Sequence, residues 1–273
     1  MIAVNLGNQL NQLVREARAR MFDEGEFAQL TYGAFDIAAR SMQEMSQEEI
    51  EVKFPIGYNP DRTVLESVRK YRKDQLLAKY QHLAFYQLSV NALVQLVTHV
   101  ENMLSDVVRA VVVKYPQKLG GKRTITIQSV LESTSLEEMH LRATDTLLNE
   151  LTYKSPADFA EAIEQLMGIK LLECPAFHCY IEIKASRDIY IHNRGIANDV
   201  YIRKAGTHMR CKSGMTLPAD VQYFLESYEY CLQVADWLEK ELHEHWHSSS
   251  YEDKQKPQLE IALNPELPAT DSE

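Results

Sequence analysis

The 273-residue chain has few of the residues that interrupt regular structure or cross-link it. Its 10 glycines and 9 prolines are too few for a turn-rich β-sandwich. Its 4 cysteines form no CxxC pair and are too sparse for a small secreted disulfide framework, so we expect reduced thiols. No uninterrupted apolar run approaches the roughly 18–20 residues of a membrane-spanning helix, and the N-terminus lacks a signal-peptide apolar region. We therefore expect a soluble, cytoplasmic protein with no membrane partner.

The formal net charge of -10 argues against a protein that coats nucleic acid with its whole surface. The basic residues are nevertheless concentrated in two islands. Residues 107–131 hold five lysines and arginines and no acidic residue, while residues 184–212 hold seven against Asp188 and Asp199. Each island could bind a polyanion locally, and each pattern equally fits solvated surface charge.

Helical spacing of apolar residues dominates the chain and predicts an all-α bundle. Residues 8–45 are typical of one or two amphipathic helices, and residues 61–115 contain no glycine or proline. Further helices are expected over residues 135–151, 156–168 and 175–192, and over residues 217–246. One buried helix face is marked by an apolar stripe at intervals of three and four residues, formed by Val90, Leu93, Val97, Val100, Leu104, Val107 and Val111.

Local signals place several of these helix ends. Ser135 with Glu138 forms a capping box, and Ser155 followed by Pro156 is a typical helix start. The segment Phe54–Pro60 is interpreted as a loop and as the main boundary. The predicted organisation is an N-terminal helical extension (1–60), a helical domain (61–247) and a disordered, acidic, proline-containing tail (248–273).

Three patterns suggest metal or phosphate chemistry but are better explained structurally. His243–His247 matches HExxH, yet no structured downstream element supplies a third ligand, so adventitious metal binding is the stronger interpretation. Cys174, His178 and Cys179 lack a second ligand pair at zinc-ribbon spacing. The segment from Gly120 to Thr124 fails the phosphate-loop pattern because Arg123 separates the lysine from the threonine. We therefore expect no metal and no cofactor.

The segment Ser186–Gly195 stands out because it combines three chemical functions on one predicted helix. Asp188 and His192 are four residues apart, so the carboxylate could orient the imidazole. Arg187 adds a permanent cation suited to phosphate. Asn193 follows at the helix end, where its amide could contact a ligand or satisfy free backbone carbonyls. Ile189 and Ile191 are expected to anchor the helix in the core.

The pattern R-[D/N]-x-x-x-H-N on a late helix resembles the signature of the HEPN superfamily (higher eukaryotes and prokaryotes nucleotide-binding domain). The long helix around residues 83–115 and the closing helix over residues 217–246 are similar to helices of that family. The resemblance covers roughly residues 62–246. Residues 1–60 lie outside it, where they could carry regulation or partner binding.

The resemblance implies a metal-independent endoribonuclease, usually a homodimer that brings two motifs into one cleft. It assigns Arg187 and His192 as the catalytic pair, with Asp188 and Asn193 as their polar neighbours. RNA would be the substrate, and cleavage by its 2′-OH would leave 2′,3′-cyclic phosphate and 5′-OH ends. Many members are toxins or anti-phage effectors, so an antitoxin or defence-system partner is expected. In one branch a tyrosine stands two positions after the histidine, where this chain has Arg194.

Two other interpretations remain open from the sequence. The first is a HEPN-like module that has lost catalysis and binds nucleotide or protein. Intact Arg187 and His192 argue against it, because a degenerate copy commonly loses one. The second is a helical scaffold with a coincidental motif, which predicts a buried His192.

Overall fold

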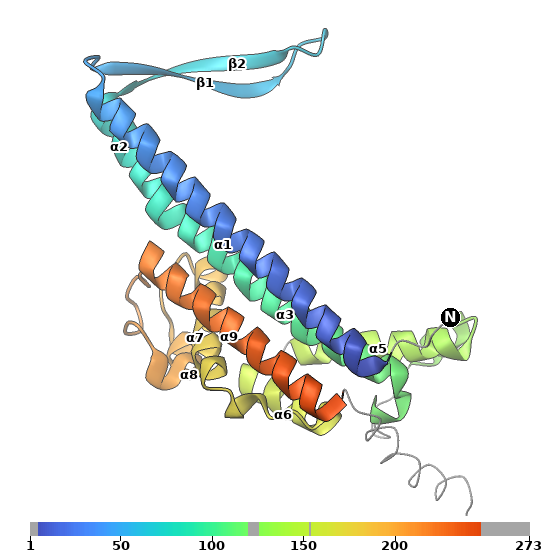
Figure 1. The fold of residues 1–273 in the computed structure, drawn as a ribbon. Helices are drawn as coiled ribbons and strands as arrows, with labels where there is room; N and C mark the ends of the chain where they lie inside the picture. The colour runs from blue at the N-terminus through green and yellow to red at the C-terminus, as the bar shows by residue number, and fades with distance from the viewer. Residues whose placement is uncertain (1–4, 120–125, 153, 247–273) are drawn as a thin grey trace, which may run out of the picture. The chain divides into compact units, whose positions relative to one another are not determined.

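The structure is a computed structural model that describes residues 5–119, 126–152 and 154–246. It is predominantly helical, which confirms the predicted all-α class (Figure 1). The predicted tail, residues 248–273, lies outside the described residues. In chain order the elements are α1 (Leu6–Glu44), β1 (Glu49–Tyr58), β2 (Val64–Arg72), α2 (Lys73–His82), η1 (Leu83–Gln87), α3 (Leu88–Lys114), η2 (Pro116–Leu119), α4 (Ile127–Glu132), α5 (Leu136–Thr152), α6 (Pro156–Met167), η3 (Leu171–Glu173), α7 (Pro175–His192), α8 (Asp199–Ala205), η4 (Gly206–His208) and α9 (Val221–Trp246).

The chain forms two compact units, and each takes segments from separate parts of the sequence. The first comprises Met1–Ala19, Val100–His178 and Leu232–Glu273, and the second comprises Arg20–His99 and Cys179–Cys231. The predicted boundary near residue 60 falls in the turn between β1 and β2. The units therefore interleave along the chain rather than follow one another, because α1, α3, α7 and α9 each supply residues to both.

In the first unit, the sequence signals for helix ends are confirmed. The Ser155 hydroxyl accepts a hydrogen bond from the Asp158 amide at 3.2 Å, and Gly168 ends α6 in the left-handed conformation with φ 75°. The Ser135 hydroxyl accepts from the Glu138 amide at the start of α5. The core of this unit is aliphatic, and its fully buried side chains include Leu10, Val14, Met103, Val108, Leu147 and Ile163.

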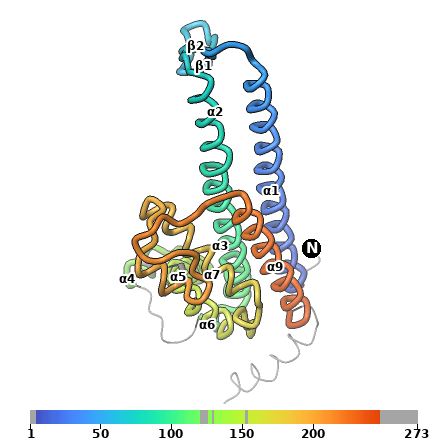
Figure 2. The backbone as a smooth tube through the Cα atoms, turned by 90° about the vertical axis from the view of Figure 1, so that its left-hand side faces the viewer, coloured from blue at the N-terminus to red at the C-terminus, as the bar shows by residue number. Residues whose placement is uncertain are grey.

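In the second unit, α1 runs antiparallel to α2 and the start of α3 (Figure 2). The Phe35 ring meets Tyr80 edge-on at 5.5 Å between centroids, and the Tyr32 hydroxyl lies 3.0 Å from that of Ser89. The expected helix over residues 8–45 is thus one continuous helix. Its two internal glycines do not break it, because tertiary packing outweighs their low helix propensity.

The β1–β2 hairpin connects these helices and corrects the predicted loop at Phe54–Pro60. Antiparallel pairing runs from Glu49↔Arg72 to Tyr58↔Val64, with an irregularity between Pro55 and Gly57. Alternation of apolar and charged residues along β1 explains the strand, since successive side chains point to opposite faces. The proline and glycine that suggested a loop instead mark this irregularity.

The continuous helical segment Lys73–Lys114 is long and apolar enough to cross a membrane, judged on length and composition alone. We expected no such segment because the sequence has no long uninterrupted apolar run. In Lys73–Lys114, polar residues stand between the apolar ones. The predicted stripe is confirmed as a buried face from Leu93 to Val111, while Val90 is half-buried. Burial of this kind is also found in core helices of soluble proteins.

Two glycines of α1 are expected to respond oppositely to alanine. A Cβ at Gly25 would lie 2.7 Å from the Tyr228 ring, which packs against Phe22 and Phe224, so Gly25→Ala should destabilise the fold by about 1–3 kcal/mol. A Cβ at Gly33 meets nothing within 4 Å, so Gly33→Ala should stabilise it by about 0.5–1 kcal/mol. Urea unfolding of both variants measures the difference. Equal stabilisation by both would contradict the packing of Tyr228 on α1.

Candidate functional site

Helix α7 carries the R-D-x-x-x-H-N segment and ends immediately after His192. The amides of Asn193 and Gly195 both donate to the Ile189 carbonyl, at 2.9 and 3.1 Å. Arg194 and Gly195 take positive φ values of 54° and 77°, which turns the chain away from the helix axis. This turn leaves the His192 side chain exposed at the helix end.

The loop after α7 is tied back to it, and Asn193 takes part in that bonding. The Asn193 side-chain amide donates to the Ile196 carbonyl, and the Leu217 amide donates to the Gly195 carbonyl at 2.7 Å. The sequence left two roles open for the Asn193 amide, contact with a ligand or a hydrogen bond to a free backbone carbonyl. The structure shows the hydrogen bond to a carbonyl. The side chain thus fixes the turn that presents His192.

Asp188 bridges two cations. Its Oδ1 lies 3.1 Å from Arg187 Nη1, and its Oδ2 lies 3.2 Å from Nζ of Lys204 on α8. The predicted contact between Asp188 and His192 is not formed: in the described part of the chain, no hydrogen bond or ion pair joins their side chains. Permanent cations compete better for a carboxylate than a neutral imidazole does. Asp188 therefore positions Arg187 and Lys204 rather than the histidine.

Lys204 is the site residue that the motif did not identify. It lies 16 residues beyond Asp188, on the short helix α8, which the sequence reading missed. Asn198 caps that helix by accepting from the Tyr201 amide at 3.0 Å. The sequence signal for α8 is the cap Asn198 followed by the acidic Asp199 in the first turn. A helix of 7 residues is too short to show a periodic stripe of apolar residues.

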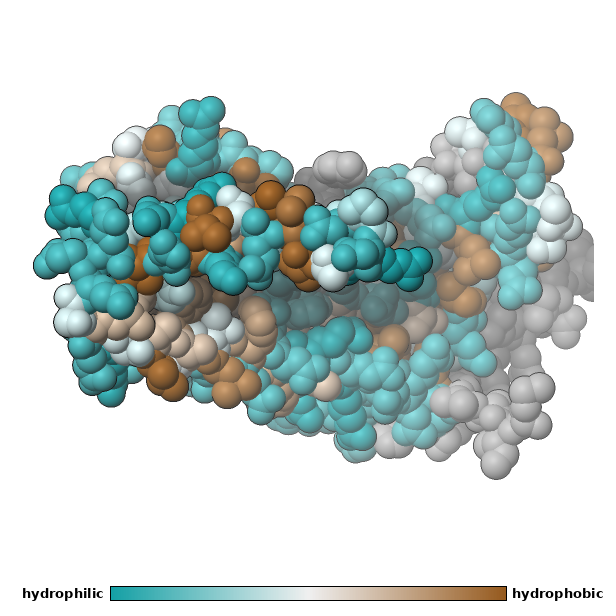
Figure 3. Space-filling model, turned by 90° about the horizontal axis from the view of Figure 1, so that it is seen from above, coloured by the Kyte–Doolittle hydropathy of each residue, from teal (hydrophilic) through white to brown (hydrophobic). Residues whose placement is uncertain are grey.

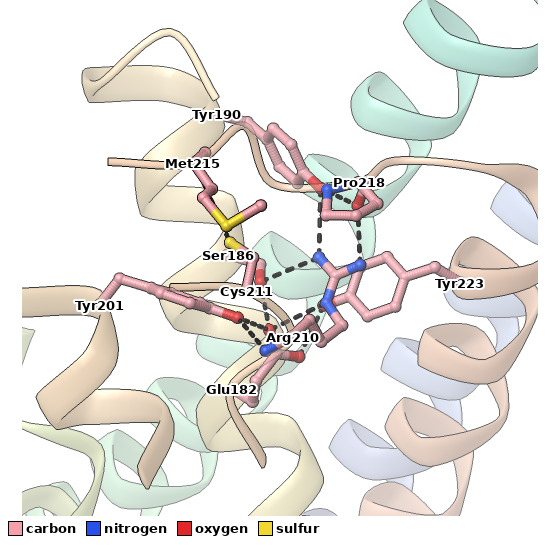
Figure 4. A network of polar contacts seen from close by, with 9 residues as sticks. All are labelled: Glu182, Ser186, Tyr190, Tyr201, Arg210, Cys211, Met215, Pro218 and Tyr223. Atoms are coloured by element: carbon pink, nitrogen blue, oxygen red, sulfur yellow. Dashed lines mark hydrogen bonds and ion pairs between the residues drawn. The ribbon is translucent and has the colours of Figure 1, made fainter. Parts of the chain in front are cut away.

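A second face of α7 holds a buried polar network around Glu182 (Figure 4). Glu182 is 4% exposed and accepts hydrogen bonds from Ser186 at 2.5 Å and from Tyr201 and Tyr223 at 2.8 Å. Arg210 pairs with the same carboxylate at 3.1 Å through Nε. Four donors from α7, α8, α9 and the intervening loop therefore converge on one buried carboxylate, as a buried charge requires.

Arg210 extends the network to the loop before α9. Its Nη1 donates to the Pro218 carbonyl at 2.7 Å, and its guanidinium lies over the Tyr223 ring. The Tyr190 hydroxyl donates to the same carbonyl at 2.6 Å. Burial raises the pKa of Tyr190, and likewise that of Tyr201, to about 12, so both phenols remain donors at neutral pH.

The two isoleucines of the motif have different environments. Ile189 is 4% exposed and packs in the core with Tyr201 and Leu217. Ile191 is 48% exposed, so the prediction that it anchors the helix is wrong. On a helix, two residues separated by two positions lie on nearly opposite sides, and only one can face the core.

No family model, curated protein or solved structure matches this chain.

The basic island at 184–212 divides between structural and exposed cations. Arg210 is committed to Glu182, while Arg187 and Lys204 share Asp188. The exposed remainder includes Arg194, Arg203 and Lys212. Of these three, Arg194 lies in the turn after α7, Arg203 lies on α8, and Lys212 lies in the segment between α8 and α9.

The basic island at 107–131 is partly neutralised within the first unit. Arg109 pairs with Asp145, and the Lys118 ammonium lies 5.6 Å from the Trp246 ring centroid. Lys122 and Arg123 lie outside the described residues. The described part of this island therefore offers less unpaired charge than the sequence suggested.

The remaining candidate patterns show no converged metal site. Over residues 5–119, 126–152 and 154–246, no three His, Cys, Asp or Glu side chains gather as metal ligands would. His247, the second histidine of HExxH, lies outside those ranges. All four cysteines are free in the structure, and Cys174 and Cys231 are buried.

Proposed function

We propose that this chain is a metal-independent endoribonuclease, with Arg187 and His192 as its catalytic pair. One observation carries the proposal: an exposed imidazole stands at the end of α7, one turn from a carboxylate that holds two cations. The resemblance of this segment to the HEPN signature supports the same assignment. A coincidental motif in a scaffold predicted a buried His192, and the exposed side chain argues against that interpretation.

The chemistry relies on the 2′-OH of RNA, which is a nucleophile beside the scissile phosphate. His192 would transfer a proton to or from a reacting oxygen. Arg187 would bind the phosphate and stabilise the negative charge that grows on its oxygens in the transition state. Lys204 would supply a second cation, and Asp188 would hold both cations in place. The products are a 2′,3′-cyclic phosphate and a 5′-OH.

A homodimer would supply a second His192, so that one imidazole acts as base and the other as acid. The proposed partners are therefore RNA, a second copy of the chain and an antitoxin or defence-system protein that controls it. A toxin or anti-phage effector of this kind would act in the cytoplasm, where its RNA substrate is present.

Cleavage of an RNA in EDTA by the purified full-length chain tests the proposal. The matched substrate is the same oligonucleotide with 2′-O-methyl groups throughout, which preserves the phosphates and removes the nucleophile. We expect cleavage of the first RNA and none of the second. Cleavage of both substrates, or cleavage that requires added Mg²⁺, would contradict the mechanism. Binding of both without cleavage would favour the catalytically inactive nucleotide- or protein-binding module.

A further inference from the structure

The β1–β2 ribbon is an amphipathic two-stranded sheet at the end of α1 and α2 (Figure 1). On one face, Ile50, Val52, Phe54 and Tyr71 are half-buried, and the Arg69 guanidinium lies 5.2 Å from the Phe54 ring centroid. Seen from above, brown apolar groups interrupt the teal surface of the ribbon (Figure 3). The exposed apolar residues of the strands are Ile56, Tyr58, Val64, Leu65 and Val68.

The opposite face of the ribbon carries charges of alternating sign. Lys53 pairs with Glu66 at 3.3 Å, and Lys70 pairs with Glu51 at 3.2 Å, each across the two strands. All four side chains are exposed to between 44% and 68%. Glu51 and Lys53 therefore retain room for a further partner of opposite charge.

The hydrogen-bond register determines which backbone groups β1 presents at its free edge. The Lys73 amide donates to the Glu48 carbonyl, in register with the Ile50↔Tyr71 and Val52↔Arg69 pairs. Antiparallel pairs alternate between bonded and non-bonded, so the even-numbered residues of β1 bond to β2. The odd-numbered residues, including Glu51 and Lys53, point their backbone groups outward. Such an edge is a template for another strand.

The charges along β1 favour a second β1 strand as the partner at this edge, and they favour one register of that pairing. A two-fold antiparallel pairing of β1 with a second β1 can be centred on any residue from Ile50 to Lys53. A centre at Glu51 or at Lys53 places two like charges directly opposite each other, although a centre at Glu51 also opposes Glu49 to Lys53. A centre at Ile50 opposes Glu49 to Glu51, which again are like charges. Only a centre at Val52 opposes Glu51 to Lys53, and it does so twice.

We propose that β1 pairs with β1 of a second copy about a two-fold axis at Val52, forming a four-stranded antiparallel sheet. Each Glu51 then lies between Lys70 of its own chain and the partner's Lys53. The row across the sheet reads Lys70, Glu51, the partner's Lys53 and the partner's Val68. The partner's Glu66 lies diagonal to its Lys53 and pairs with it. On the apolar face, Val52 meets the partner's Val52, and Ile50 meets the partner's Phe54.

The β2 edge is less suited to this pairing. A two-fold axis at Val68 would also oppose Glu66 to Lys70, but it would place Ser67 opposite Arg69 on the apolar face. The β1 edge instead brings together three apolar residues from each chain. Pro55 has no amide hydrogen, which limits the paired segment at its far end.

Disulfide cross-linking in the full-length chain tests the register. Val52 would be a non-hydrogen-bonded pair with the partner's Val52, at a Cα separation near 4.5 Å that a disulfide can span. We expect Val52→Cys to cross-link as a dimer under mild oxidation. The parent chain controls for its native cysteines. Val68→Cys is the control on β2, where a two-fold axis at Val68 would give a hydrogen-bonded pair. Its preferential cross-linking would overturn the proposal.

Charge reversal in the Val52→Cys background tests specificity. Adding Glu51→Lys or Lys53→Glu makes each variant repel its own copy, so cross-linking should slow by about tenfold or more. An equimolar mixture restores opposite charges at both pairs and should recover the rate. Cross-linking that is unaffected by single reversal, or not recovered by mixing, would overturn the proposal. The readout is independent of RNA cleavage, because none of these residues belongs to the α7 site.

Discussion

Replacing His192 by alanine is expected to lower the rate of RNA cleavage by about 10²–10⁴-fold. In the proposed mechanism, the exposed imidazole at the end of α7 would transfer the proton. The change should leave the fold intact, since the His192 side chain is exposed and forms no hydrogen bond or ion pair with the part of the chain that the structure describes. Single-turnover cleavage in EDTA measures the rate, and thermal unfolding measures the stability.

His208→Ala is the matched control, because His208 is also exposed and lies in the same unit. Its cleavage rate should equal that of the wild type. Equal losses in both variants would contradict the assignment of His192, as would full activity of His192→Ala.

The largest expected loss of stability is that of Arg210→Ala, at about 3–5 kcal/mol. This change leaves the Glu182 carboxylate buried at 4% exposure without its cation. It also removes the guanidinium hydrogen bonds to the Pro218 carbonyl and to the Ser186 hydroxyl of α7, and leaves the Tyr190 hydroxyl as the remaining donor to that carbonyl. Urea unfolding measures the free energy of unfolding.

Arg203→Ala provides the comparison for this prediction, since Arg203 is exposed on the neighbouring helix α8. It should change the free energy of unfolding by no more than about 0.5 kcal/mol. Adding Glu182→Gln to Arg210→Ala should recover part of the lost stability, because the unpaired charge is removed. A loss below about 1 kcal/mol in Arg210→Ala would contradict the network as described.

Helix ends were predictable wherever the signal is local. Ser155, Pro156 and Gly168 bracket α6 within 14 residues, and the backbone responds to each of them directly. The hairpin was missed because Pro55 and Gly57 are also typical loop residues. Apolar and charged residues alternate along β1 only from Glu49 to Phe54, and the pairing that extends the strand to Tyr58 comes from β2.

The positions of the candidate residues within α7 could be predicted from the sequence, but their contacts with other elements could not. Spacing alone placed Arg187, Asp188 and His192 on neighbouring turns of α7. The partner of Asp188 is Lys204, and the partner of Glu182 is Arg210, which lies 28 residues away. Such contacts depend on how α8 and the following loop fold back, which helical periodicity does not encode.

The most direct test of the central claim is to identify the chemical ends left when wild type and His192→Ala digest one RNA in EDTA. We expect 2′,3′-cyclic phosphate and 5′-OH ends from the wild type and almost no fragments from the variant. Fragments ending in 3′-OH, or the same cyclic ends at an undiminished rate from His192→Ala, would contradict it.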